Sequence, residues 1–295
     1  MAKTFTTLRN LYGSLTEDTS TANLTLGDQL INDRILQIRT RRAWDFTEVT
    51  STITTVASQQ AYQLPVDYRK MRTVKSTVGS NTVVLRQAPN KAFFDTLNQS
   101  ATTSTTLSWF FIIGSQIQFF PTPSASANTV TITYSTQTID LSQADTVSGN
   151  ILTATNGSTA IVGTGTTFTA GMVGQYLQIA SITGDNRWYE IAAFTDTTNI
   201  ALTKEYAGTS IAAGSASYII GQLPQLPENY HVLPVYGAVS DYYLKTDKSG
   251  RGDRYLQKYN ERITELIQDH ASKTDEYVIE GREPLQENPN LYVTQ

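Results

Sequence analysis

Hydrophobic residues recur at helical spacing in the first part of the chain. The periodic positions are Leu26, Leu30, Ile31, Ile35 and Ile38. Because polar residues occupy the positions between them, the pattern predicts an amphipathic helix over residues 25–43. Thr25 and Asp28 resemble a capping box, which indicates that this helix begins at Thr25. A shorter set of apolar residues between Phe5 and Leu15 predicts a small helix before it.

Helical spacing returns after Pro227 in two stretches separated by the Gly-containing turn at 249–252. The apolar positions are Val232, Val235, Tyr236, Val239, Tyr242 and Tyr243, then Tyr255, Leu256, Tyr259, Ile263, Leu266 and Ile267. This pattern predicts an αα-hairpin. A single amphipathic helix cannot bury its apolar stripe alone, so we expect the helix at 25–43 to pack on this hairpin.

Between the helical ends the pattern changes to short strands. Alternating apolar and threonine residues, punctuated by Pro, Gly and Asn, predict strands between Val49 and Leu85 and again between Val130 and Tyr134. Residues 109–120 predict a hairpin that turns at Gly114-Ser115, and residues 91–97 a short helix. Residues 146–222 are rich in Gly, Thr, Ala and Ser, with strand patterns about every 10 residues, which is typical of a small all-β barrel or sandwich.

Together these elements predict an α+β fold: a discontinuous helical bundle with antiparallel strands and an inserted all-β barrel or sandwich module. We place the main domain at 1–145 and 223–273 and the inserted β module at 146–222. Residues 274–295 lack periodicity and contain prolines, so they are interpreted as an extended C-terminal tail.

Composition and charge exclude several functional classes. Charged residues make up 16% of the 295 positions, the formal net charge is -4, and there is no cysteine. No apolar run approaches the length of a membrane span, and mild acidity disfavours a phosphate-neutralising DNA binder. Disulfides and thiolate chemistry are excluded, and the N-terminus lacks the apolar segment of a secretory signal, so we expect synthesis in the cytoplasm.

Residues for catalysis or metal binding are scarce. The chain has only His231 and His270, no G-x-S-x-G nucleophile elbow and no calcium-loop pattern. We therefore predict no catalytic residue, no metal and no cofactor. The densest basic patch is Arg34, Arg39, Arg41 and Arg42. It has two interpretations: a solvated, dipole-compensating helix end, or an electrostatic contact with an acidic partner or neighbouring subunit.

A series of local motifs occurs along the chain in the order Trp44-Asp45-Phe46, Tyr62-Gln63-Leu64-Pro65, Asp67 to Met71, Ile117 to Pro123, and Leu226 to Tyr230 before the paired helices. This series resembles the head-to-tail adaptor (connector, head-completion or neck) proteins of tailed bacteriophages. The resemblance covers residues 1 to about 140 and 223 to about 272. The module at 146–222 departs from the simpler members of that family.

The resemblance implies a structural virion protein that forms a ring, usually a dodecamer, between the portal protein and the tail or nozzle proteins, with tail fibres as a further candidate partner. DNA would pass through the channel at genome ejection without specific binding, and the protein would reside in the virion neck, with no membrane contact. Candidate partner contacts in the tail are Tyr277, Leu285, Leu291 and Tyr292.

Two other functions stay open at this point. The first is a receptor- or glycan-binding virion protein that uses exposed aromatic residues of the β module, for which the candidates are Trp188, Tyr189 and Tyr206. The second is a cell-wall hydrolase, whose paired carboxylates would be set by the fold and not by sequence spacing.

Overall fold

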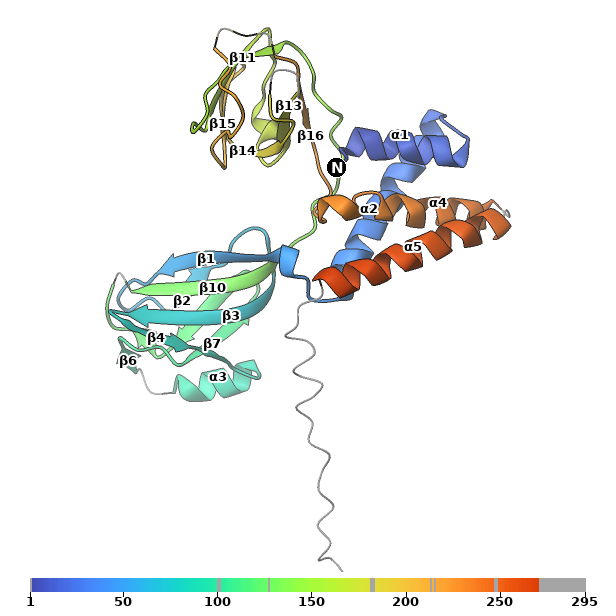
Figure 1. Ribbon diagram of the computed structural model, residues 1–295. Coiled ribbons are helices and arrows are strands. Elements are labelled where there is room, and N and C mark those ends of the chain that lie inside the picture. The colour runs from blue at the N-terminus through green and yellow to red at the C-terminus, as the bar shows by residue number, and fades with distance from the viewer. Residues whose placement is uncertain are drawn as a thin grey trace, which may run out of the picture. The chain divides into compact units, whose positions relative to one another are not determined.

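The computed structural model describes residues 2–99, 102–126, 128–180, 184–212, 214, 216–246 and 249–270. The chain divides into two compact units (Figure 1). The first unit consists of Met1–Arg42 and Ile139–His270, and the described part of the second is residues 43–99, 102–126 and 128–138. The first unit thus brings together segments from both ends of the chain. A main domain at 1–145 and 223–273 with an insert at 146–222 stays a prediction.

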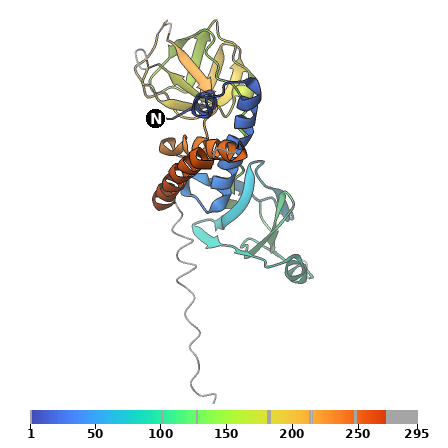
Figure 2. The same cartoon turned by 90° about the vertical axis from the view of Figure 1, so that its right-hand side faces the viewer.

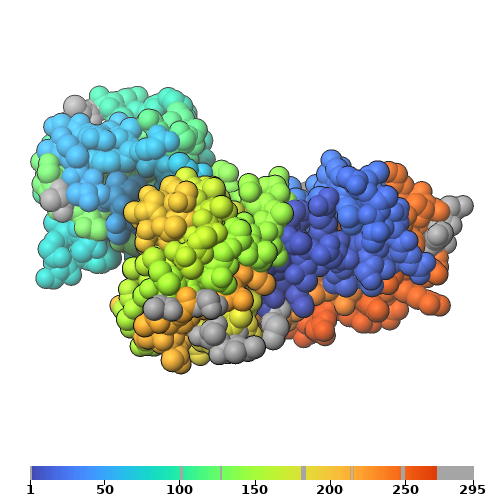
Figure 3. All heavy atoms as spheres, turned by 90° about the horizontal axis from the view of Figure 1, so that it is seen from above, coloured from blue at the N-terminus to red at the C-terminus, as the bar shows by residue number. Residues whose placement is uncertain are grey.

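Four helices build the helical part of the first unit: α1 (Phe5–Thr16), α2 (Thr21–Arg41), α4 (Leu233–Lys245) and α5 (Ser249–His270). Helix α2 contacts α4, α4 contacts α5, and α1 contacts both α2 and α4 (Figures 1 and 2). In Figure 3 the blue residues of α1 and α2 lie against the orange and red residues of α4 and α5. The predicted packing of the N-terminal helix on the C-terminal hairpin is confirmed.

The apolar stripes of these helices form one core. Its fully buried members include Leu8, Tyr12, Ile31, Val235 and Val239. Removing each aliphatic side chain from water contributes about 1.5–3 kcal/mol, which explains why segments more than 200 residues apart in sequence associate. The short 3₁₀ helix η3 (Glu228–Tyr230) precedes α4, and Pro234 lies in the first turn of α4, where the missing N–H costs least.

The start of α2 differs from the prediction. The helix begins at Thr21, and Ser20 is its N-cap, since the Ser20 side chain accepts a hydrogen bond from the Asn23 N–H. Thr25 lies inside the helix and donates its hydroxyl to the Thr21 carbonyl at 2.8 Å. The predicted capping box at Thr25 is therefore wrong, because a second cap residue was available one turn earlier.

The β module of the first unit is a single six-stranded sheet that curves into a half-barrel. Its strand order is β11-β12-β15-β14-β13-β16. The strands are β11 (Asn150–Ala154), β12 (Ala160–Thr164), β13 (Tyr176–Ile179), β14 (Trp188–Asp196), β15 (Asn199–Leu202) and β16 (Tyr218–Gly221), with the 3₁₀ turn η2 (Ala170–Met172) before β13. The alternate residues that face inward, such as Ile161, Leu177 and Ile220, are fully buried. The predicted all-β module and the α+β fold class are confirmed.

The second unit consists mainly of two four-stranded sheets, with orders β1-β10-β3-β4 and β2-β8-β7-β5. The strands are β1 (Glu48–Thr54), β2 (Ala61–Gln63), β3 (Tyr68–Val78), β4 (Asn81–Val84), β5 (Arg86–Gln87), β7 (Trp109–Ile113), β8 (Gln116–Phe120) and β10 (Thr129–Thr136). A short pair, β6 (Thr103–Ser104) with β9 (Thr122–Pro123), the 3₁₀ turn η1 (Asp45–Thr47) and helix α3 (Lys91–Leu97) complete it. Inward-facing residues of both sheets, such as Val74, Phe119 and Ile132, share one core.

Candidate interaction surfaces

The four arginines predicted as one basic patch have different environments. Arg34 forms an ion pair with Asp241 of α4, in which its Nε donates to a carboxylate oxygen at 2.8 Å, and its guanidinium lies over the Tyr259 ring of α5 at 5.2 Å. Burial opposes the charge, but the bonds to Asp241 raise the pKa of Arg34 overall. Gly237 makes room, because a Cβ there would lie 2.8 Å from the Arg34 Cδ. Arg34 therefore connects three helices.

Arg39 is also an internal residue. It is 2% exposed and donates a hydrogen bond to the side chain of Gln225. Its position follows from the spacing of Ile31, Ile35 and Arg39, which places it on the buried stripe of α2. Arg39 is almost fully buried, which leaves its side chain little surface for a partner. Arg34 is half-buried, and its contact with a partner stays a prediction.

Arg41 and Arg42 are exposed at the C-terminal end of α2. Within the described ranges, neither forms an ion pair. Their role as partner contacts stays a prediction. The other predicted partner contacts, Tyr277, Leu285, Leu291 and Tyr292, lie outside the described residues.

The aromatic residues predicted to be exposed on the β module are mostly buried. Tyr206 is fully buried and Tyr189 is 7% exposed, with ring centroids 5.5 Å apart, so the prediction is wrong for both. Successive strand residues point to opposite faces, and in β14 Tyr189 faces the core while Trp188 faces outward. Trp188 is half-buried.

Trp188 lies in a groove of about 450 Å³ on the outside of the β module. Residues of this groove include Tyr176, Arg187, Trp188, Glu190, Lys204 and Glu205. Burial and the nearby Glu190 carboxylate raise the pKa of Tyr176, so its hydroxyl is protonated at neutral pH.

A buried histidine fixes the N-terminal segment, a contact that the sequence did not predict. The Lys3 N–H donates to the His231 Nδ1 at 3.0 Å, and the His231 Nε2 donates to the Leu226 carbonyl at 2.9 Å. Both ring nitrogens are thus used by the neutral tautomer with its proton on Nε2. Burial lowers the pKa of His231, which is 2% exposed.

The next residues of the same segment bind the two connections to the β module. The Thr4 hydroxyl donates to the Asp145 carboxylate at 2.7 Å, and the Phe5 N–H donates to the Gln222 carbonyl at 2.9 Å. Gly221 is required for this close approach, since a Cβ there would lie 2.6 Å from Asp145 and 2.9 Å from Thr4. We call residues 3–6 the N-terminal strap, because they hold the chain before β11 and after β16.

Side-chain amides complete the junction. Gln222 accepts hydrogen bonds from the backbone N–H groups of Ser142 and Gln143, at 2.6 and 2.8 Å. Asn32 of α2 exchanges two hydrogen bonds with the backbone of Leu141. The segment after Ile139 is thereby held by side chains of α2 and of the chain after β16.

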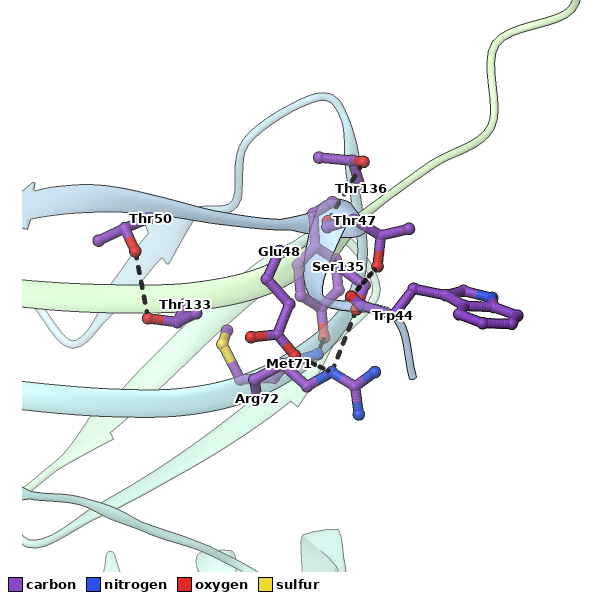
Figure 4. A network of polar contacts seen from close by, with 10 residues as sticks. Trp44, Thr47, Glu48, Thr50, Met71, Arg72, Thr133, Ser135 and Thr136 are labelled. Atoms are coloured by element: carbon purple, nitrogen blue, oxygen red, sulfur yellow. Dashed lines mark hydrogen bonds and ion pairs between the residues drawn. The ribbon is translucent and has the colours of Figure 1, made fainter. Parts of the chain in front are cut away.

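In the second unit a polar network joins β1, β3 and β10 (Figure 4). Arg72 lies 3.3 Å from Glu48 and donates to the buried Ser135 hydroxyl at 3.1 Å. Thr50 and Thr133 form a cross-strand hydrogen bond at 3.4 Å. Trp44, from one of the motifs that suggested the phage resemblance, is fully buried and stacks on Phe46 at 5.6 Å, so this motif is a packing element.

Threonines line most of the outward face of that sheet, and Glu48 and Lys75 are the charged residues beside them in the register. Thr50 of β1, Thr133 of β10 and Thr73 of β3 lie side by side across the three strands. The pairs Thr52–Thr131 and Thr54–Thr129 lie on the same face. Most of these threonines are exposed. A β-branched residue loses little side-chain entropy on burial, so this face is suited to contact another protein surface.

Over the described residues, no group of three or more His, Cys, Asp or Glu side chains is placed to hold a metal ion. In the same part of the chain, no helix is both long enough and apolar enough to cross a membrane.

Comparison with known proteins decides the family. Residues 3–161, more than half of the chain, match the family described as SU10 adaptor protein. The chain belongs to the SU10 adaptor protein family. It is therefore a phage adaptor protein, a structural component of the virion and not an enzyme. No curated protein matches the sequence.

The family match covers α1, α2, the second unit and part of the β module, ending within β12. It includes the motifs at Trp44, Tyr62 and Ile117, so the resemblance to phage adaptors is confirmed. The helical hairpin of α4 and α5 lies outside the matched residues.

Proposed function

We propose that this adaptor forms a homo-oligomeric ring of twelve subunits. The ring joins the portal vertex of the phage capsid to the tail and extends the DNA channel. The observation that carries this proposal is the family match over residues 3–161. The ring docks on the portal with one face and binds tail or nozzle proteins, or tail fibres, with the other. This places the adaptor in the virion neck after its synthesis in the host cytoplasm.

The charge of the chain is compatible with a DNA channel. A net charge of -4 with 16% charged residues provides little attraction for phosphates, so DNA passes without being held. Interface cores are depleted in Lys, Glu and Asp, and the low charge of this chain is compatible with extensive contact between subunits. The threonine-rich face of the β1-β10-β3 sheet, which also carries Glu48 and Lys75, supports the proposal as a surface with few charges that suits contact with a neighbouring subunit.

In this proposal residues 1–145 and 223–273 form the ring-building domain and residues 146–222 an accessory module. Arg41 and Arg42 contact an acidic patch of the portal or of the next subunit, and residues 274–295 add contacts through Tyr277, Leu285, Leu291 and Tyr292.

Electron-microscopic averages of the purified adaptor, alone and mixed with its portal protein, test the proposal. We expect closed rings on the portal. A persistent monomer that never forms rings on the portal would contradict it.

Charge reversal at Arg41 and Arg42 tests their proposed contact with an acidic patch, with portal binding as the measurement. We expect Arg41→Glu with Arg42→Glu to reduce portal binding at least tenfold, while Lys91→Glu on α3, whose partner Asp95 is exposed, changes it less than twofold. Deletion of residues 274–295 separately measures the contribution of the tail. Unchanged portal binding in either variant would remove that contact from the proposal.

A further inference from the structure

The groove on the β module combines aromatic rings with charged side chains. Tyr176 pairs with Glu190 and Gln178 with Trp188 in the β13–β14 ladder. All four side chains therefore point to the outer face of the sheet. Tyr176 and Trp188 are diagonal cross-strand neighbours, a relation in which two residue positions are usually about 7–8 Å apart. Within the described residues the rings of Tyr176 and Trp188 do not stack on each other, and both side chains are half-buried in the groove.

The wall of the groove is held in place by the buried tyrosine. The Tyr189 hydroxyl donates to Asp185 and accepts a hydrogen bond from the Ala207 N–H at 3.0 Å. The Thr203 N–H donates to the Glu190 carbonyl at 2.8 Å. These bonds attach the segment 203–207 to β14, so the groove is formed before any ligand binds, which lowers the entropic cost of binding.

The charged side chains of the groove are available to a ligand. Arg187, Glu190, Lys204 and Glu205 are all exposed, and none of them takes part in an ion pair within the described ranges. Cations and anions are equal in number, so the groove has no net field that would attract a polyanion such as nucleic acid.

We propose that this groove is a carbohydrate-binding site that takes an uncharged oligosaccharide of the bacterial surface. The aromatic rings of Tyr176 and Trp188 contact the apolar C–H face of a sugar ring. The mixed donors and acceptors around them bind hydroxyl groups, each of which both donates and accepts. A groove of about 450 Å³ lies in the range of small-molecule sites. The choice of a bacterial sugar rests on the phage function proposed above.

The full chain on an array of bacterial surface oligosaccharides tests the site. The array carries O-antigen, capsular and peptidoglycan-derived glycans, and the strongest signal is followed by calorimetry with that glycan. We expect Trp188→Ala to weaken its binding at least tenfold and Trp188→Phe less than threefold. Lys204→Met and Glu190→Gln are exposed substitutions that keep the fold, and we expect each to weaken binding about threefold.

Val147→Ala is the matched control, because Val147 is 61% exposed and does not line the groove. We expect it to bind as the unmodified chain does. The inference is overturned if no glycan binds the full chain above a glycan-free surface, or if Trp188→Ala and Lys204→Met bind like the unmodified chain. Rings on the portal without glycan binding would overturn only this inference, and glycan binding without rings only the proposed function.

Discussion

The helical core and the β module belong to the same compact unit, yet they bury polar groups in different ways. In the helical core three polar pairs link the two chain ends, and their partners are far apart in sequence: 207 residues for Arg34 and Asp241, 186 for Arg39 and Gln225, and 228 for Lys3 and His231. In the β module they are closer: 4 residues for Tyr189 and Asp185, and 31 for Thr166 and the Thr197 carbonyl.

This difference indicates what each region depends on. The helical core closes a discontinuous chain, so its polar pairs stabilise the association of the two chain ends. The β module is built from one continuous segment, and its polar pairs fix turns that the chain already brings close. Substitutions that break the helical pairs are therefore expected to destabilise the whole unit. Substitutions that break the β-module pairs are expected to destabilise only the segments near them.

The largest effect is expected at Arg39. Arg39→Ala should lower the free energy of unfolding by about 2–3 kcal/mol, because it removes a charge-assisted hydrogen bond and the buried side-chain stem. Urea denaturation followed by circular dichroism measures it. Arg42→Ala, at an exposed arginine of the same helix end, should change stability by less than about 0.5 kcal/mol. An equal loss of unfolding free energy in the two variants would show that the buried position of Arg39 does not contribute to stability.

The Arg34–Asp241 pair should rank second. Asp241→Ala leaves a mostly buried guanidinium without its carboxylate, and we expect a loss of about 2 kcal/mol. Glu265→Ala breaks the exposed pair with Arg262, whose side chains are 54% and 51% exposed, and should cost less than about 0.5 kcal/mol. A double-mutant cycle with Arg34→Met should give a coupling of about 1 kcal/mol or more. Additive effects would refute the proposed coupling.

In the β module, Tyr189→Phe should cost about 1 kcal/mol, because the variant loses the bonds to Asp185 and Ala207. Hydrogen exchange should accelerate in residues 203–207 and stay unchanged in α2 and α4. Tyr176→Phe is the control, since the Tyr176 hydroxyl forms no hydrogen bond with another described residue, and it should leave exchange unchanged. Faster exchange in the helices of the Tyr189 variant would contradict the local character of the module.

The smallest effect concerns pH and His231. Its folded-state pKa lies below the ordinary 6.5, because burial disfavours the charged ring and Nδ1 must accept the Lys3 N–H. Below pH 6.5 the unfolded chain binds the extra proton, so this contribution to stability is present above pH 6.5 and is lost as pH falls until the folded-state pKa is reached.

Unfolding curves at pH 7.5 and 5.5 measure this contribution. His231→Gln retains a donor and an acceptor but does not titrate, so its stability should fall less between the two pH values than that of the unmodified chain. An identical fall in both proteins would exclude His231 as the titrating group.

Most secondary structure could be predicted from the sequence, because helix and strand periodicity are local properties. The helical hairpin, the turn at Gly114-Ser115 and the helix at 91–97 match the structure. The start of α2 could not be fixed, since both Ser20 and Thr25 are good cap residues and the choice depends on local competition.

The site residues were harder to predict, although two signals were present. The spacing of Arg39 from Ile35 placed it on the buried stripe of α2, and strand alternation meant that Trp188 and Tyr189 could not both face outward. No local signal identified His231 or the N-terminal strap, because their partners lie far along the chain.

The sequence by itself determined the elements, the α+β class and the phage-adaptor family, because these depend on local periodicity, composition and ordered motifs. Only the tertiary structure decided which charges are used internally and which face outward. A charged or aromatic side chain is buried when a partner far along the chain supplies its hydrogen bond, and that pairing exists only after the chain ends have associated. Arg39 and Arg42 show the result: three positions apart in sequence, one lies inside the core and the other on the surface.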